Sequence, residues 1–336
     1  NYFGYEVLKY LTDDVRKFVL TSALFESFDS SLCHAVLGAE SVLVLDKLVT
    51  QELFLMPVEG ASGSFRYHSL LQDFLQRRLL VEEGVEYINH LHRSAAEHFL
   101  TKSMHTQAIR HASMCDDLEY YYSILALSCN RWIKSGEFES VLSSLANISD
   151  DVLIKSPSLS TALAYALIFS RRFNQAQYHL DLMSDVYTSE KVNVSFLVAV
   201  LGLFQRETEI FDGVNVEQFT KEHSHTDRRA VSMVIEAYVF LYRGQLESAL
   251  VTASEAKIYL SKTGHTFLES YADLVVILCD RYMGRGIEAI QYMTEVYSHV
   301  DENFKTPVWA NLATGMMVVY YEQNKLDAAV DLCQKL

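Results

Sequence analysis

A repeating pattern of apolar and polar positions runs through the chain from about residue 90 onward. Each copy is an apolar helical segment, a short polar or glycine turn, and a second segment that opens on an aromatic or aliphatic residue. Because one step of 73 residues is about two repeats long, we expect a degenerate copy near residues 205 to 212. The turn residues follow one another at steps of 33, 35, 73, 40 and 40: Ser103, Gly136, Arg171, Gly244, Gly284 and Asn324.

Small residues recur at two fixed distances from these turns. Small side chains at fixed spacing allow two antiparallel helices to approach closely. The pattern resembles the tetratricopeptide repeat, a helix-turn-helix of about 34 residues, although the later steps are longer. We therefore expect an α-α superhelix whose concave side is lined by the first helix of each pair. The small residues are Ala108, Val141, Ala176, Ala249, Ala289 and Ala329, five positions after the turns, and Ala96, Cys129, Ala164 and Ala237, seven positions before four of them.

The first 84 residues carry no repeat and predict a small separate module. Turn and capping residues divide this part into helical and strand-like segments. Helices and one β-hairpin in this order are typical of a winged helix, so we divide the chain into a winged-helix-like domain at 1–84 and a repeat superhelix at 85–336. The predicted segments are helices at 13–24, 31–38, 41–51 and 69–79, and strands at 53–59 and 64–68 around the turn 60–63.

Composition supports a mainly α fold and weakens a role in DNA binding. The chain has only 3 Pro and 13 Gly among 336 residues, which favours long helices with short turns. Its net charge is −15, and residues 1 to 84 alone hold 7 Lys or Arg against 12 Asp or Glu, a net charge of −5. Direct recognition of DNA by this winged helix is therefore disfavoured, since phosphate contacts need a basic surface.

Cysteine usage and hydropathy indicate a cytoplasmic location. The 5 cysteines form no C-x-x-C pair and lie among apolar residues, as expected of buried, reduced thiols. No apolar run reaches the roughly 18 residues of a membrane span, and no signal peptide is visible. The chain begins with Asn1 and ends within a helix-like segment, so we expect a piece of a longer polypeptide.

Four segments over about the first 115 residues carry a resemblance to a known family. They are VRKFVLTSALFESFDSSLCHAVLG, LVTQELFLMPVE, FRYHSLLQDFLQRRL and LHRSAAEHFLTKSMHTQAIRHA, in this order. The chain resembles the central part of the MalT-like, large ATP-binding LuxR-type transcriptional regulators, which are signal-transduction ATPases with numerous domains (STAND). In that family an ATPase precedes the winged helix, and a LuxR-type helix-turn-helix follows the repeats.

The resemblance implies a sensor region of an ATP-dependent transcriptional activator. It implies that a small inducer or a regulatory protein binds the superhelix, and it leaves room for self-association. The sequence has no G-x-x-x-x-G-K-[ST] loop and no basic helix-turn-helix after residue 300. We therefore expect no cofactor in this stretch, ATP or ADP on a missing ATPase domain, and DNA contacts only through a missing C-terminal domain.

His68 is the residue that the resemblance singles out. The segment FRYHSLLQDF is similar to a Met-His-Asp segment in which the histidine contacts the phosphate of bound ADP, which implies this role for His68 in the intact protein. Here Tyr67 and Ser69 stand where that segment has Met and Asp. The alternative is a histidine that satisfies backbone groups where a strand meets a helix.

Ligand-binding residues on the concave face are predicted from the phase of the first helices. We expect Asn130, Tyr165, Tyr238, Arg281 and Tyr321 to lie there. The aromatic groups Tyr120 to Tyr122 and Trp132 fit a sugar-stacking platform or, as is commoner in repeats, a core.

Metal binding and catalysis are not predicted. His90 with His92, and His223 with His225, stand two positions apart, which points them to nearly opposite sides of a helix. Three acidic pairs lie at apparent helix starts and are assigned to capping: 13–14, 116–117 and 150–151. We expect no enzyme activity in this stretch. A sensor therefore competes with a protein-interaction scaffold and, more weakly, with an accessory domain of an enzyme.

Overall fold

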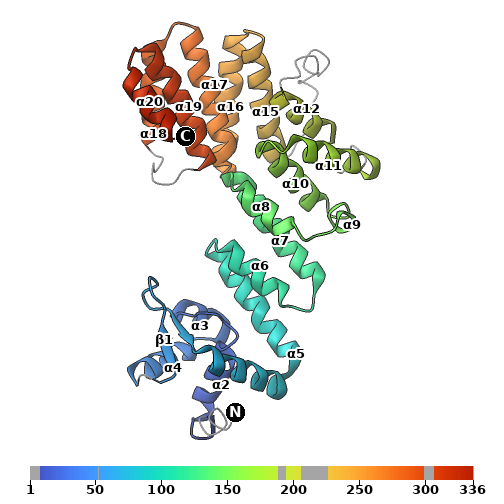
Figure 1. Ribbon diagram of the computed structural model, residues 1–336, viewed down its shortest axis with the longest axis vertical. Helices are drawn as coiled ribbons and strands as arrows, with labels where there is room; N and C mark the ends of the chain where they lie inside the picture. Colours follow the sequence, from blue (N-terminus) through green and yellow to red (C-terminus); the bar gives the residue numbers. More distant parts are fainter. Residues whose placement is uncertain (1–7, 52, 188–193, 206–225, 299–305, 336) are drawn as a thin grey trace. The chain divides into compact units, whose positions relative to one another are not determined.

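The computed structural model describes residues 8–51, 53–187, 194–205, 226–298 and 306–335 (Figure 1). The chain divides into two compact units, Asn1–Ser128 and Cys129–Leu336, which are described separately below as unit 1 and unit 2. The expected domain boundary at residue 84 stays a prediction, and that residue lies at a kink between two helical segments of unit 1.

Unit 1 begins with the elements of a winged helix, as predicted. Its two strands pair antiparallel, with Leu55 opposite Tyr67, and an isolated bridge from Phe28 to Phe65 extends the pairing. Asp29 begins the second helix as a cap, since its carboxylate accepts from the Leu32 N–H at 2.8 Å. The elements are α2 (Asp13–Ser22), α3 (Ser30–Leu37), α4 (Glu40–Thr50), β1 (Leu55–Pro57), β2 (Phe65–Tyr67) and α5 (Ser69–Thr101).

A buried aromatic core holds this module together. The rings of Phe18 and Tyr67 pack on either side of Phe28, at centroid distances of 6.1 and 5.3 Å. The Tyr67 hydroxyl lies 2.8 Å from the Ser22 hydroxyl, and burial raises the pKa of Tyr67. The Gln72 side chain donates to the Ala23 and Phe25 carbonyls at 3.0 and 2.8 Å, which ties α5 to the turn after α2.

A kink at Gly84 divides α5 into two helical segments. Gly84 has a φ of 79°, a left-handed value that is not helical. The first segment runs past the expected end near residue 79, and the second pairs with α6 (His105–Ser113) to form the first helical hairpin. The winged helix is therefore followed by the repeats across this kink.

The rest of the described chain consists of successive antiparallel helices, which confirms the expected mainly α, tetratricopeptide-like fold (Figure 1). Helix α7 (Leu118–Ser135) passes from unit 1 into unit 2. The degenerate copy expected near residues 205 to 212 lies almost entirely outside the described residues. The remaining helices are α8 (Phe138–Leu145), α9 (Asp150–Leu153), α10 (Pro157–Phe169), α11 (Phe173–Val186), α12 (Val194–Gln205), α15 (Thr226–Tyr242), α16 (Leu246–Thr263), α17 (Thr266–Tyr282), α18 (Gly286–Ser298), α19 (Pro307–Glu322) and α20 (Leu326–Lys335).

All the turn residues named from the sequence adopt left-handed backbone. Each ends a helix with a hydrogen bond that reaches back five residues, such as Glu137 N–H to the Trp132 carbonyl at 2.8 Å. Three of them are not glycine and bear the cost of a side chain in this conformation. Their φ angles are 58° at Ser103, 83° at Gly136, 57° at Arg171, 73° at Gly244, 77° at Gly284 and 58° at Asn324.

The columns of small residues are buried between paired helices, as predicted. In the first hairpin Ala96 and Ala108 are both 0% exposed and pack in one cluster. In the later hairpin of α15 and α16, Ala237 and Ala249 are likewise 0% exposed. Close helix approach at alanine-sized positions therefore forms the framework of the repeats.

Candidate functional site

An aromatic cluster from several hairpins forms the centre of unit 2. Phe169, at the end of α10, is its hub, with ring centroids 5.4 Å from Phe138, 5.2 Å from Phe204 and 4.9 Å from Phe267. We call it the inner aromatic cluster: Phe138, Tyr165, Phe169, Phe204, Tyr238, Phe267 and Tyr271. Because its rings come from α8, α10, α12, α15 and α17, it joins helices of hairpins that are distant in sequence.

Hydrogen bonds from side chains to backbone carbonyls bring two of these distant hairpins together. The Lys134 ammonium donates to the Thr263 carbonyl and the Thr266 hydroxyl donates to the Lys134 carbonyl, both at 3.4 Å. A Cβ at Gly136 would come within 2.9 Å of Phe267. The turn after α7 can therefore lie against the start of α17 because position 136 has no side chain.

The inner aromatic cluster is partly open to solvent. Phe138 and Phe267 are buried, whereas the other five rings are half-buried. Burial raises the pKa of Tyr271 to about 12, although a hydrogen bond with Asn311 and the charge of Arg171 oppose the shift. Half-buried rings of this kind offer flat apolar faces for stacking.

Tyr238 differs from its neighbours in its hydroxyl group. Its ring lies edge-on to Tyr271 at 5.9 Å, and its hydroxyl is buried without a hydrogen-bond partner in the structure. Burial and the nearby Tyr271 raise the pKa of Tyr238, so the phenol stays protonated.

The structure brings together two of the five predicted ligand-binding residues, Tyr165 and Tyr238, in the inner aromatic cluster. Asn130 is exposed on α7, and Tyr321 is 68% exposed on α19. Arg281 pairs with Glu322 at 2.5 Å. No described ring contact joins these last three positions to the cluster, and their role in binding stays a prediction.

Sequence reasoning missed the other five rings of the cluster: Phe138, Phe169, Phe204, Phe267 and Tyr271. Phe169 stands two positions before the turn residue Arg171, a place that the pattern marks as the end of a first helix. An aromatic residue near the end of a first helix was therefore a sequence signal that could have identified the cluster.

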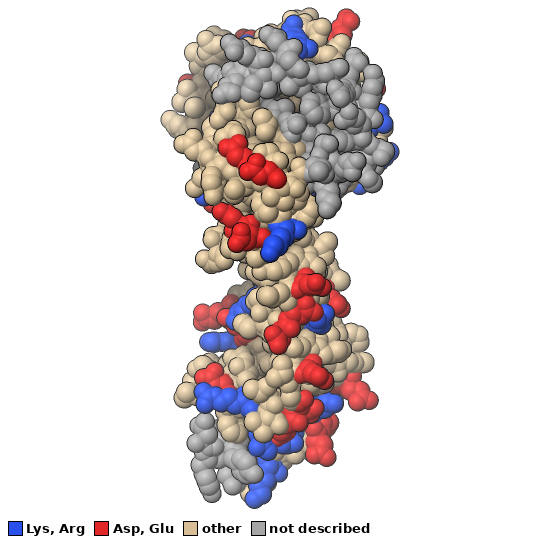
Figure 2. Space-filling view, turned by 90° about the vertical axis from the view of Figure 1, so that its right-hand side faces the viewer, with Lys and Arg blue, Asp and Glu red and all other residues tan. Residues whose placement is uncertain are grey.

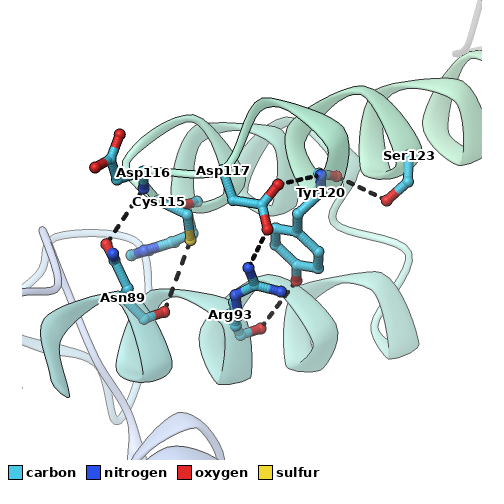
Figure 3. Close-up of polar contacts among 8 residues, drawn as sticks. Asn89, Arg93, Cys115, Asp116, Asp117, Tyr120 and Ser123 are labelled. Atoms are coloured by element: carbon cyan, nitrogen blue, oxygen red, sulfur yellow. Dashed lines mark hydrogen bonds and ion pairs between the residues drawn. The ribbon is translucent and has the colours of Figure 1, made fainter. Parts of the chain in front are cut away.

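A polar junction in unit 1 joins α5 to the start of α7 (Figure 3). The Arg93 guanidinium pairs with the Asp117 carboxylate and lies 4.5 Å from the Tyr120 ring centroid. Asp117 also caps α7 by accepting from the Tyr120 N–H at 2.9 Å, as the sequence predicts for this acidic pair. On the other side, Asn89 accepts from the Asp116 N–H at 3.3 Å. The junction therefore satisfies its polar groups internally.

Buried polar pairs recur in three hairpins at an unexpected fixed spacing of 19 residues. They join the position eleven residues before the turn to the position eight residues after it. The pairs are His92 Nδ1 with His111 Nδ1 at 2.9 Å, the Ser160 carbonyl with His179 Nε2 at 3.0 Å, and the Asp273 carboxylate, which accepts from the Tyr292 hydroxyl at 2.6 Å.

The His92–His111 pair lies beside the winged helix. Phe99 stacks on His111 at 5.4 Å, and Phe25 meets it edge-on at 5.6 Å. Burial, the nearby His92 and Arg110 lower the pKa of His111 to about 4, and burial lowers the pKa of His92. Both imidazoles are therefore neutral at pH 7.

The Asp273 pair carries charge. The Lys257 ammonium lies 2.5 Å from the Asp273 carboxylate, whose side chain is only 6% exposed. Burial and Asp273 raise the pKa of Tyr292, and burial raises that of the nearby Glu269. Three helices, α16, α17 and α18, are thus held by one buried polar cluster.

His68 occupies the place that both of its interpretations require. It is the N-cap of α5, directly after β2, and it is exposed. Its Nδ1 accepts from the Leu70 N–H at 3.3 Å. This contact is the local backbone role, and the ADP phosphate role stays a prediction.

The remaining residue groups point to packing. Trp132 is 5% exposed and belongs to the core, and the Tyr120 hydroxyl donates to the Arg93 carbonyl at 3.3 Å. Burial raises the pKa of Cys33 to about 12. The expectation that every cysteine is buried is wrong for Cys333, which is exposed on α20.

No group of metal-ligating side chains is found among the described residues. In the first histidine pair, His92 is buried and pairs with His111, which indicates a packing role. The second pair, His223 with His225, lies outside the described residues. On the face shown in Figure 2, basic and acidic side chains are interspersed over unit 1. Within the described ranges, no helix combines the length and the apolarity that a membrane crossing requires.

Comparison with known proteins confirms the resemblance read from the sequence. Residues 4–87 match the family model of the MalT winged helix domain. The chain is 25% identical over 319 residues to the HTH-type transcriptional regulator MalT of Vibrio cholerae, covering 93% of this chain and 31% of that protein. It is 25% identical over 266 residues to the MalT regulator of Klebsiella pneumoniae, covering 76% of this chain and 29% of that protein.

Among solved structures, the comparison finds a STAND protein with a tetratricopeptide repeat sensor from Pyrococcus horikoshii. It has 11% sequence identity and a TM-score of 0.41, and the match covers 96% of this chain and 54% of that one. The chain spans about a fifth to a third of the length of the MalT relatives that it matches. These relatives are transcriptional regulators, and they support a regulatory sensor role for the chain.

Proposed function

We propose that this chain is the sensor region of a MalT-like, ATP-dependent LuxR-type transcriptional activator, and that its inner aromatic cluster binds a small inducer. The MalT-type winged helix at residues 4–87 and the hairpins after it support the sensor role. ATP binding and DNA binding would belong to other parts of such a protein, and the chain itself would have no catalytic role.

The observation that carries the proposal is the origin of the half-buried rings. Tyr165 and Phe169 come from α10, Phe204 from α12, and Tyr238 and Tyr271 from α15 and α17. A molecule that stacks on these rings contacts several hairpins at once. Its binding free energy therefore depends on the spacing of the hairpins, and a ligand can shift a conformational equilibrium only through such differential contacts.

The test uses the full-length protein and a reporter promoter. We expect Phe204→Leu, which keeps an apolar residue but removes a stacking face, to reduce the inducer response at least tenfold at equal protein level. Tyr242→Leu is the matched control, because Tyr242 is 69% exposed and has no described ring contact with the cluster. Deleting residues 85–336 should abolish the response. An unchanged response in Phe204→Leu would move the inducer site elsewhere.

A second function, a protein-interaction scaffold, is favoured by a different surface. Tyr242, Tyr282 and Tyr321 are 69%, 60% and 68% exposed near the tips of three hairpins. Tyrosines at this exposure are common contact residues of protein interfaces. If the chain is a scaffold, Tyr242→Ala and Tyr282→Ala together should abolish capture of a partner protein, while Phe204→Leu should leave capture unchanged.

A further inference from the structure

The buried hydroxyl of Tyr238 is an exception among the buried tyrosines that the structure describes. The Tyr67 hydroxyl has Ser22, the Tyr292 hydroxyl has Asp273, and the Tyr271 hydroxyl has Asn311. The Tyr238 hydroxyl is buried and has no hydrogen-bond partner among the described residues. A buried polar group without a partner destabilises the folded state, and a phenylalanine would fill the same space without this cost.

The surroundings of this hydroxyl are apolar and aromatic. The Tyr238 ring meets Tyr271 at 5.9 Å, and Tyr271 in turn meets Phe204 and Phe169 at 6.1 Å each. The largest cause of the raised pKa of Tyr238 is its burial, which shows a poorly hydrated environment. An ionised ligand group placed there would lose its hydration without a countercharge, so a neutral ligand is favoured.

We infer that Tyr238 is the polar anchor of the ligand site, and that its hydroxyl hydrogen-bonds an uncharged ligand carrying a hydroxyl or carbonyl group and a flat apolar face. This inference rests on the proposed function of the inner aromatic cluster. The flat face stacks on the half-buried rings of Tyr165, Phe169 and Tyr271. A phenol suits such a ligand because it can donate and accept.

Access to the anchor links binding to movement. Because the hydroxyl is covered, a ligand reaches it only when α15 and α17 shift relative to each other at the Tyr238–Tyr271 contact. The hydrogen bond that forms then offsets part of the cost of this shift. The unsatisfied hydroxyl of Tyr238 therefore favours the arrangement of the helices in which the ligand is bound.

The experiment compares Tyr238→Phe with Tyr271→Phe in the whole 336-residue chain. Thermal unfolding is measured alone and with a panel of neutral sugars, oligosaccharides and nucleosides as probes. We expect Tyr238→Phe to melt about 2–4 °C higher than the wild type, since it loses an unsatisfied group. Tyr271→Phe should melt lower, since it removes the hydrogen bond between Tyr271 and Asn311. A probe that stabilises the wild type should bind Tyr238→Phe at least tenfold more weakly.

The outcomes separate this inference from the proposed function. If a probe binds the wild type and Tyr238→Phe equally, the anchor is wrong while the ligand site stands. If Tyr238→Phe melts lower than the wild type, the hydroxyl has a stabilising partner and the inference fails. If no probe stabilises the wild type, a neutral ligand is contradicted, whereas the reporter response of Phe204→Leu still tests the inducer site on its own.

Discussion

Polar groups have partners in the polar junction of unit 1, whereas one of them has none in the inner aromatic cluster of unit 2. In the junction, Arg93, Asp117 and Tyr120 satisfy one another between α5 and α7. In the cluster, the rings stay half-buried and the Tyr238 hydroxyl has no partner. A satisfied network suits a structural joint, whereas half-buried rings with an unsatisfied hydroxyl leave groups on which another molecule can bind. This difference supports our proposal that unit 2 carries the sensing function.

The largest expected effect comes from removing the buried carboxylate of Asp273 in unit 2. Asp273→Ala leaves the Lys257 charge without its carboxylate and the Tyr292 hydroxyl without its acceptor. We expect a loss of about 2–3 kcal/mol in the free energy of unfolding, less than for a fully buried pair because the Lys257 side chain is 24% exposed. Urea unfolding measures the loss.

The matched control is an exposed ion pair in the same unit. Arg172 contacts Glu139 at 2.9 Å, but both side chains are largely exposed, so Glu139→Ala should change stability by less than about 1 kcal/mol. Equal effects of the two variants would contradict the view that burial makes the Asp273 group important.

The next effect is acid sensitivity from the histidine pair of the first hairpin. The folded state holds the pKa of His111 at about 4, below its ordinary value of 6.5, so folding favours the neutral ring. Stability is therefore full above pH 6.5 and is lost as the pH falls toward 4. Between pH 7 and pH 5 we expect His111 to account for a loss of about 2 kcal/mol in the free energy of unfolding.

The pair can be separated from other titrating groups by a double variant. His92→Leu with His111→Leu replaces both imidazoles with apolar side chains and should remove most of this pH dependence. Urea midpoints at pH 7 and pH 5 give the comparison. An undiminished pH dependence in the double variant would assign it elsewhere, for example to His179, whose pKa burial also lowers.

The smallest expected effect is a gain of stability at a hairpin turn. Arg171 has a φ of 57°, where glycine is the favoured residue. Arg171→Gly should stabilise unit 2 by about 1 kcal/mol, measured as a rise in melting temperature. Arg172→Gly is the control, because Arg172 has an ordinary φ of −86° and should gain nothing.

The sequence pattern was sufficient to predict the helical hairpins but not the contacts between hairpins. A turn residue with alanine-sized residues at fixed distances requires local packing, and even Arg171, which is not glycine, takes left-handed backbone at its turn. The helix expected to end near residue 79 runs on to the kink at Gly84, where the backbone is not helical.

The inner aromatic cluster and the buried polar pairs could not be predicted in this way. Phe169 and Phe267 meet only because the hairpins curve back on one another, and periodicity does not determine that curvature. The 19-residue spacing is not visible in the sequence because its positions hold chemically different pairs, such as His92 with His111 and Asp273 with Tyr292. The pairs occupy the same positions in their hairpins but do not share a residue type.

Hydrogen–deuterium exchange of the whole chain, with and without a neutral probe that raises its melting temperature, tests the central claim most directly. The account predicts that the probe protects peptides of α10, α15 and α17 and leaves those of α5 and α6 unchanged. Protection confined to α5, α6 and the start of α7 would contradict it, because the ligand would then bind the region whose polar groups are already satisfied.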